Sequence, residues 1–332
     1  MIGNTKAPAL LITALVACSI AIALGQTPTP TVPPDATEIY AKAHDGVTCL
    51  QWNVYLPDGV SETNPAPVVL VVHIGGFRGG ARDDDGPKRV ATSLRNAGFI
   101  ACSIDYRLDF ADSFLGVPDK QICKSGCQNQ TTAAFADNLM PAAPETQFSD
   151  VRKAIVAARN PTCGILVGKV NGLVGVVAGS AGGTHALTCA AGWTNNDHRP
   201  DAVVCLSGIY QFDEPHFPDG NPHNLPDAMM YCRATSGTDP NLGNGSNLKL
   251  VEKDCAPVYA FGSEEDSITP QQLELLKGKF IGLNLDPLDH RTQKIEGSKH
   301  AFAYWYDKIS ASDQRYVYLV VQDWLHERLD DD

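Results

Sequence analysis

Short apolar runs alternate along this chain with segments that have the apolar spacing of a helix. Uninterrupted apolar runs of about four to eight residues are typical of strands buried on both faces. The predicted strands are Cys49–Leu56, Val68–Val72, Phe99–Tyr106, Leu173–Val177, Ala202–Leu206, Pro257–Phe261 and Arg291–Ile295. The predicted helices are Asp85–Ala97, Pro144–Arg159, a segment ending near Ala191, Pro270–Lys279 and Ser312–Arg328. This alternation predicts an α/β fold with a mostly parallel sheet and helices on both faces.

Two long segments show neither the apolar runs of strands nor the apolar spacing of helices. Residues 109–143 and 209–247 are irregular and rich in turn-forming residues. A chain of 332 residues that is 43% hydrophobic can form one large α/β domain. We therefore expect one domain over residues 45–330, with both irregular segments as insertions over the active site. Residues 26–44, rich in Thr and Pro near their start, are expected to form an extended leader.

The N-terminus has the form of a secretory signal peptide over residues 1–25. Lys6 precedes the apolar run Ala7–Leu24, and small residues near its end predict cleavage before Gln26. A retained membrane anchor is the alternative, but the run is short for a span and contains polar residues. Leu15–Cys18 also has the form of a bacterial lipoprotein box, although the apolar run continues past Cys18. The sequence therefore predicts a secreted protein without stable membrane insertion.

The net charge of −12 argues against nucleic acid or anionic membranes as partners. It does not identify a substrate or an oligomeric state. Asn129 and Asn244 begin glycosylation sequons in loop-like sequence, which suits a secreted glycoprotein.

Nine of the ten cysteines remain once Cys18 leaves with the signal segment, so at least one is not paired within the chain. Secretion permits disulfides. Cys123 and Cys127 lie in one loop, and Cys232 and Cys255 flank another. Cys102 and Cys205 fall in predicted strands, where buried thiols are expected. No Cys-x-x-Cys pair or matching histidine spacing indicates zinc, so no metal is expected.

Candidate chemistry centres on Ser180. The strand Leu173–Val177 runs into Ala178-Gly179-Ser180-Ala181-Gly182-Gly183 and then into a helix. A sharp strand-to-helix turn needs small residues, and it lifts the central serine out of the sheet edge as a nucleophile elbow does. Ala178 stands where the first glycine of that pattern is expected. A tightly packed turn without catalytic function is the alternative interpretation.

A nucleophilic serine needs a histidine base and an acid that orients it. In open α/β sheets these groups follow strands at their carboxyl ends. Asp266 lies between the strand ending at Phe261 and the helix beginning at Pro270, with Glu265 as the alternative acid. After Asp266, only His300 lies in a loop that follows a predicted strand. The order Ser180, Asp266, His300 is that of the α/β-hydrolase triad.

An oxyanion intermediate needs preorganised N–H donors. We expect these from Ala181, directly after the serine, and from Gly75 and Gly76. His73 is expected to brace that glycine loop rather than to transfer protons.

With these residues in view, the chain resembles the α/β-hydrolase superfamily, in particular its esterase and lipase branch. The resemblance rests on His73-Ile74-Gly75-Gly76-Phe77, Asp105-Tyr106-Arg107-Leu108, Gly179-Ser180-Ala181-Gly182-Gly183, Asp266 and Gly297–Phe302, in order over residues 45–328. It departs from the family pattern at Ile74, at Ala178 and in one extra residue before the acid.

The resemblance implies a carboxylic ester hydrolase that works through an acyl-enzyme, without metal or organic cofactor, on a small-molecule or polymer-linked ester. Two alternatives stay open: a serine peptidase of the same superfamily, and a catalytically inactive hydrolase fold used as a binding module.

Overall fold

The computed structural model describes residues 30–42, 49–108, 145–191, 196–212, 246–266 and 270–330. Its centre is an eight-stranded sheet of order β1-β2-β4-β3-β5-β6-β7-β8. The strands are β1 (Ala36–Lys42), β2 (Cys49–Tyr55), β3 (Ala66–Val72), β4 (Ile100–Ile104), β5 (Val170–Gly179), β6 (Ala202–Leu206), β7 (Val258–Ser263) and β8 (His290–Ile295). All neighbours from β4 to β8 pair in parallel, whereas β2 pairs antiparallel with β1 and with β4. The sheet is therefore mostly parallel, as predicted.

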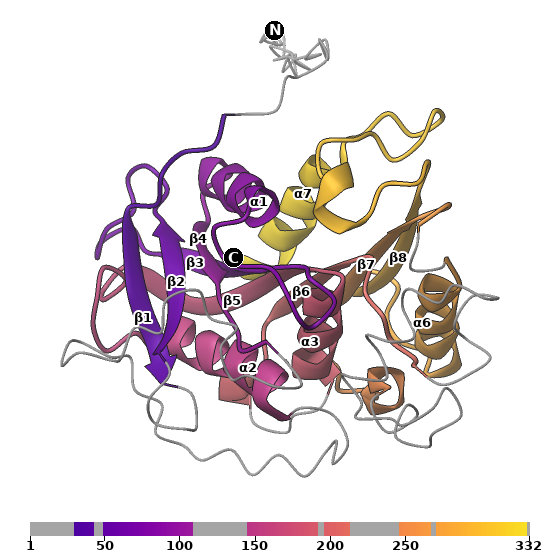
Figure 1. The fold of residues 1–332 in the computed structure, drawn as a ribbon, viewed down its shortest axis with the longest axis horizontal. Coiled ribbons are helices and arrows are strands. Elements are labelled where there is room, and N and C mark those ends of the chain that lie inside the picture. The colour runs from indigo at the N-terminus through magenta and orange to yellow at the C-terminus, as the bar shows by residue number, and fades with distance from the viewer. Residues whose placement is uncertain are drawn as a thin grey trace, which may run out of the picture.

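Helices cover both faces of this sheet (Figure 1). They are α1 (Asp85–Asn96), α2 (Glu145–Arg159), α3 (Ala181–Ala191), α6 (Pro270–Gly282) and α7 (Val317–Leu329). Buried side chains of α2, α3 and α6 pack in one core cluster with the sheet, and those of α1 and α7 pack in a second. The three layers predicted from the alternating pattern are confirmed.

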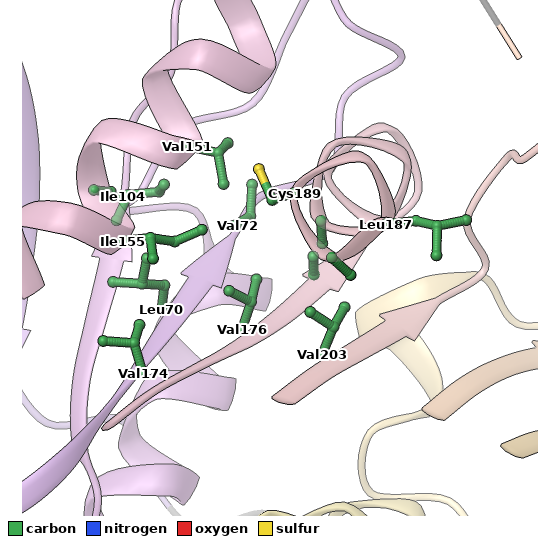
Figure 2. Packing of buried hydrophobic residues seen from close by; sticks show 14 of the residues in the cluster. Leu70, Val72, Ile104, Val151, Ile155, Val174, Val176, Leu187, Cys189 and Val203 are labelled. Carbon is green, nitrogen blue, oxygen red and sulfur yellow. The ribbon is translucent and has the colours of Figure 1, made fainter. Parts of the chain in front are cut away.

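Strand β3 explains why the sequence shows apolar runs without alternation. Leu70 and Val72 belong to the first core cluster, and Val69 and Val71 belong to the second. Both faces of the strand are buried from solvent, so its side chains are apolar on both faces. Figure 2 shows the first cluster, where Val151 of α2 lies close to the sheet beside Val72.

Two predictions differ most from the observed elements. Residues 36–42, assigned to the leader, form β1, which pairs antiparallel with β2 at the sheet edge. The last helix begins at Val317 rather than at Ser312, because the chain before it turns back and Lys308 pairs with Tyr316 in an isolated antiparallel bridge.

The described cysteines are of two kinds. Cys102, Cys205 and Cys255 are buried free thiols, so Cys255 does not pair with Cys232. Cys189 is buried, and its thiol donates to the Phe148 carbonyl at 3.7 Å. Burial raises the pKa of the Cys102 and Cys205 thiols, as expected for these strand positions. Cys49 and Cys163 are disulfide-bonded.

Several sequence predictions lie outside the described residues. These are the signal peptide, both sequons, the Cys123 and Cys127 loop and most of the two insertions. In the part of the chain that the structure describes, none of the helices has the length and apolarity needed to cross a membrane.

Candidate active site

Ser180 lies at the carboxyl end of β5, between that strand and α3. Its backbone φ of 51° is left-handed, a strained conformation for a residue with a side chain. Its N–H donates to the Leu206 carbonyl of β6 at 2.8 Å, and its carbonyl accepts from the Thr184 N–H at 3.2 Å. The serine thus ends a strand and begins a helix at once, which is the predicted elbow.

The glycines around Ser180 allow other chain segments to approach it. A Cβ on Gly182 would lie 2.7 Å from the His73 carbonyl oxygen. A Cβ on Gly179 would lie 2.7 Å from Ile74 Cγ2 and 3.1 Å from Ala301 Cβ. The loop after β3 and the loop that carries His300 therefore both pack against the elbow.

His300 and Asp266 are brought together, as predicted. His300 Nδ1 lies 2.8 Å from Asp266 Oδ1. The Asp266 side chain is fully buried, whereas that of His300 is 28% exposed. An ionised carboxylate only accepts hydrogen bonds, so Nδ1 carries the proton and Nε2 is left as the acceptor. This is the tautomer that a general base needs.

The alternative acid does not reach this histidine. Glu265 and its neighbour Glu264 are exposed. The Glu265 N–H donates to the Gly297 carbonyl at 3.0 Å, and Ser263 Oγ donates to the Lys299 carbonyl at 2.5 Å. The acid loop after β7 is thus bonded along its length to the histidine loop after β8.

The predicted oxyanion loop follows β3 directly. Gly75, Gly76 and Phe77 have φ values of 140°, 57° and 67°. The Gly75 carbonyl accepts the Arg78 and Gly79 N–H groups at 3.1 and 2.9 Å, which folds the loop into a tight turn. Among the described residues, no hydrogen bond engages the N–H of Gly75 or of Gly76.

His73 is buried beneath this loop. Its ring stacks on Tyr106 with centroids 4.2 Å apart, and its Nδ1 lies 2.8 Å from the Ile74 carbonyl oxygen. Burial lowers the pKa of His73, although the hydrogen bond to Ile74 opposes that shift. A neutral ring that donates to the loop backbone fits a bracing role.

A second buried histidine was not predicted. His185 of α3 lies with its Nε2 3.0 Å from Gln147 Oε1, and Gln147 Nε2 donates to the Phe77 carbonyl at 2.9 Å. Burial, reinforced by His73, lowers the pKa of His185 to about 3. The neutral ring therefore supports the predicted oxyanion loop through Gln147. No sequence pattern separated these two residues from the other buried polar residues of α2 and α3, such as Asp150 and Thr184.

Ser207 was also missed. It follows β6 directly and donates a hydrogen bond to Asp266 Oδ2. No glycine pattern or histidine spacing marked it.

The described residues contain no group of three or more His, Cys, Asp or Glu side chains placed to hold a metal ion. The polar atoms gathered at the sheet edge form hydrogen bonds with one another instead.

Comparisons with known proteins rest on structure alone, because no protein-family model and no curated protein matches the sequence. Similar solved structures include an acetyl ester-xyloside bifunctional hydrolase from Caldicellulosiruptor lactoaceticus, with TM-score 0.60 and 15% identity over 89% of this chain and 97% of that one. A truncated carbohydrate esterase from gut microbiota has TM-score 0.60 and 15% identity over 90% and 99%.

A thermophilic esterase from Thermogutta terrifontis, solved with propionate bound, has TM-score 0.57 and 14% identity over 90% of this chain and 96% of that one. At such identities the likeness bears on architecture only. Together with the strand order and the helices on both faces, it shows that the chain has the α/β-hydrolase fold.

Proposed function

We propose that this protein is a secreted serine hydrolase that cleaves carboxylic esters through an acyl-enzyme. Ser180 is the nucleophile, His300 the general base and acid, and Asp266 the group that orients His300. The N–H groups of Gly75, Gly76 and Ala181 form the oxyanion hole. The observation that carries the proposal is the 2.8 Å contact between His300 and the buried Asp266 carboxylate, with the His300 loop packed against the strained Ser180 elbow.

The chemistry follows from these roles. His300 Nε2 takes the proton of Ser180 Oγ as that oxygen attacks the ester carbonyl, and the oxyanion receives hydrogen bonds from the backbone. The carbonyl then re-forms, the bond to the alcohol oxygen breaks, and His300 gives its proton to the leaving alcohol. Water repeats the sequence on the acyl-enzyme and releases the acid.

Turnover of short p-nitrophenyl esters tests the proposal. We expect Ser180→Ala and His300→Ala to lower kcat by about 10³-fold or more. Ser93→Ala is the matched control, because Ser93 is a buried serine of α1 whose Oγ accepts from Gln322 at 2.9 Å. Turnover by Ser180→Ala equal to that of the native protein would disprove the nucleophile.

A fluorophosphonate probe separates an enzyme from a binding module. The thermophilic esterase 2 of Thermogutta terrifontis has been solved phosphonylated by sarin. We expect one adduct on this chain, located at Ser180 by mass spectrometry and lost in Ser180→Ala. A protein that neither takes the label nor turns over any ester or peptide would be a binding module, and preferential cleavage of peptides would identify a peptidase.

The acyl and alcohol preference needs a substrate panel. One structural neighbour is named an acetyl ester-xyloside bifunctional hydrolase and another a carbohydrate esterase, so the panel includes acetylated xylosides beside feruloyl esters and simple esters of increasing acyl length. We propose an extracellular ester as substrate, because residues 1–25 have the form of a signal peptide. Expression in a secreting host should release a chain that begins at Gln26; retention of the chain in the cell fraction would contradict secretion.

A further inference from the structure

Ser207 occupies a crossing point between three segments of the site. It is 4% exposed, and its φ of 54° is left-handed, like that of Ser180 on the neighbouring strand. Its Oγ contacts Asp266 Oδ2, lies 3.1 Å from the Ala301 backbone nitrogen and lies 3.1 Å from the Tyr304 hydroxyl. Asp266 follows β7, and Ala301 and Tyr304 follow β8, so this one oxygen joins three strand ends.

The hydrogen-bond roles at this oxygen are fixed by chemistry. A serine hydroxyl has one proton and two lone pairs. The Ala301 N–H can only donate, and the Asp266 carboxylate can only accept. The Ser207 proton therefore goes to Asp266. The single Tyr304 proton faces both Ser207 Oγ at 3.1 Å and the Phe261 carbonyl at 3.4 Å, and Ser207 accepts it at the shorter of the two distances. Burial raises the pKa of Tyr304 well above its ordinary value, so its hydroxyl keeps the proton that this arrangement requires.

We propose that Ser207 is a positioning residue for the triad, which holds Asp266 and the His300 loop in one arrangement; the inference rests on the proposed function. Asp266 uses one carboxylate oxygen for His300 and the other for Ser207. With both oxygens engaged, the carboxylate cannot rotate away from Nδ1. The hydrogen bond to the Ala301 N–H fixes the backbone directly after His300.

The backbone conformation at Ala301 and Ser207 supports a functional reason for the contact between Ser207 and Asp266. Ala301 also has a left-handed φ, of 48°. Ser207 and Ala301 are both non-glycine residues in this region, and Ser207 is bonded to Ala301 and to Asp266, which indicates a conformation held by its surroundings. Conformational cost of this kind is typical of sites where geometry matters more than stability.

The test is the steady-state kinetics of Ser207→Ala on the p-nitrophenyl ester that the native protein turns over best. A charge-assisted hydrogen bond to the carboxylate is lost, so we expect kcat to fall about 10- to 100-fold while KM stays within about twofold. The acidic limb of the kcat/KM profile, which reports protonation of the base, should move to higher pH. The carboxylate that has lost one donor holds the protonated ring more strongly.

The other described charged groups of these loops have no hydrogen bond to Ser207. Lys299 Nζ lies 2.7 Å from Asp307 Oδ1, and Glu264 and Glu265 are exposed. A shifted limb therefore reports the Asp266 contact. A residue that served only packing would lower the melting temperature without moving the limb.

A second variant keeps the proposal testable if Ser207→Ala folds poorly. Ser207→Gly accepts the left-handed φ and also lacks Oγ, so it should show the same kcat loss and the same shifted limb. Ser93→Ala should show neither change. A kcat within twofold of the native value and an unmoved limb in Ser207→Gly would overturn the inference.

The two proposals fail in different ways. If Ser180→Ala abolishes turnover and Ser207→Gly retains it fully, only the positioning role is wrong. If Ser180→Ala retains turnover, or the native protein turns over no ester, the proposed function is wrong and the positioning role falls with it.

Discussion

Replacing Gly179 with alanine should damage both stability and catalysis, because the added methyl group meets three side chains of the site. Its Cβ would lie 2.7 Å from Ile74 Cγ2, 3.1 Å from Ala301 Cβ and 3.3 Å from Phe302 Cζ. Carbon atoms pack best at about 3.5–4.0 Å, so Ile74 must move by about 1 Å. Overpacking of a close-packed core costs about 1–3 kcal/mol.

The same displacement reaches the groups that we propose to react. Ile74 precedes the oxyanion loop, and Ala301 directly follows His300. A shift of about 1 Å at catalytic groups can lower kcat about 10²-fold. We therefore expect Gly179→Ala to unfold at lower denaturant concentration and to lose activity by about that factor, with the m-value unchanged.

Gly278→Ala is the matched control. Gly278 lies inside α6, and a Cβ there would meet nothing within 4 Å. Alanine is a better helix former than glycine by about 0.8–1.0 kcal/mol, so this variant should gain stability and keep its activity. Ile74→Ala combined with Gly179→Ala should recover part of the loss, because the shortest contact is removed. Native stability and native kcat in Gly179→Ala would refute the reasoning.

Asp266→Asn should lower kcat by about 10⁴-fold, because an amide can hold His300 in the wrong tautomer, whereas Glu265→Gln at an exposed position should change kcat less than about twofold. Equal losses would contradict the choice of acid. Burial lowers the pKa of His185 to about 3, and an unfolded histidine titrates near 6.5. Between those values only the unfolded chain binds the proton. Denaturant titrations should therefore give a free energy of unfolding about 3 kcal/mol lower at pH about 4.5 than above pH 7 from this residue. His185→Gln should weaken that pH dependence, and an unchanged dependence would disprove it.

The sequence predicted the strands and helices that have a strong apolar pattern, and it missed features that depend on single contacts. Buried runs such as Val68–Val72 identified the parallel strands, because burial on both faces leaves a strong apolar signal. The edge strand Ala36–Lys42 was missed, since only Tyr40 and Ala41 of it are buried and its polar residues resemble a leader. The last helix was predicted to begin at Ser312, whereas Tyr316 is its N-cap and the helix begins at Val317.

The candidate site divides in the same way. Ser180, Asp266 and His300 each follow a strand, and parallel strands deliver their carboxyl ends to one sheet edge. The position of each of these residues directly after a strand could therefore be predicted from the sequence. Ser207 and His185 act through partners 59 and 38 residues away in the chain. Contacts over such separations leave no local pattern, and only the folded chain reveals them.

The two departures from the family pattern near the elbow are explained by packing. Ala178 is fully buried in the core cluster shared with α2 and α3, so a methyl group has room there. The positions that exclude a Cβ are Gly179 and Gly182, with contacts at 2.7 Å. Ile74, which replaces a glycine of the oxyanion loop, makes the 2.7 Å contact at Gly179. The larger side chain of Ile74 thus fits against Gly179, which has no side chain. A glycine at position 178 is not needed, because no neighbour excludes the Ala178 methyl group.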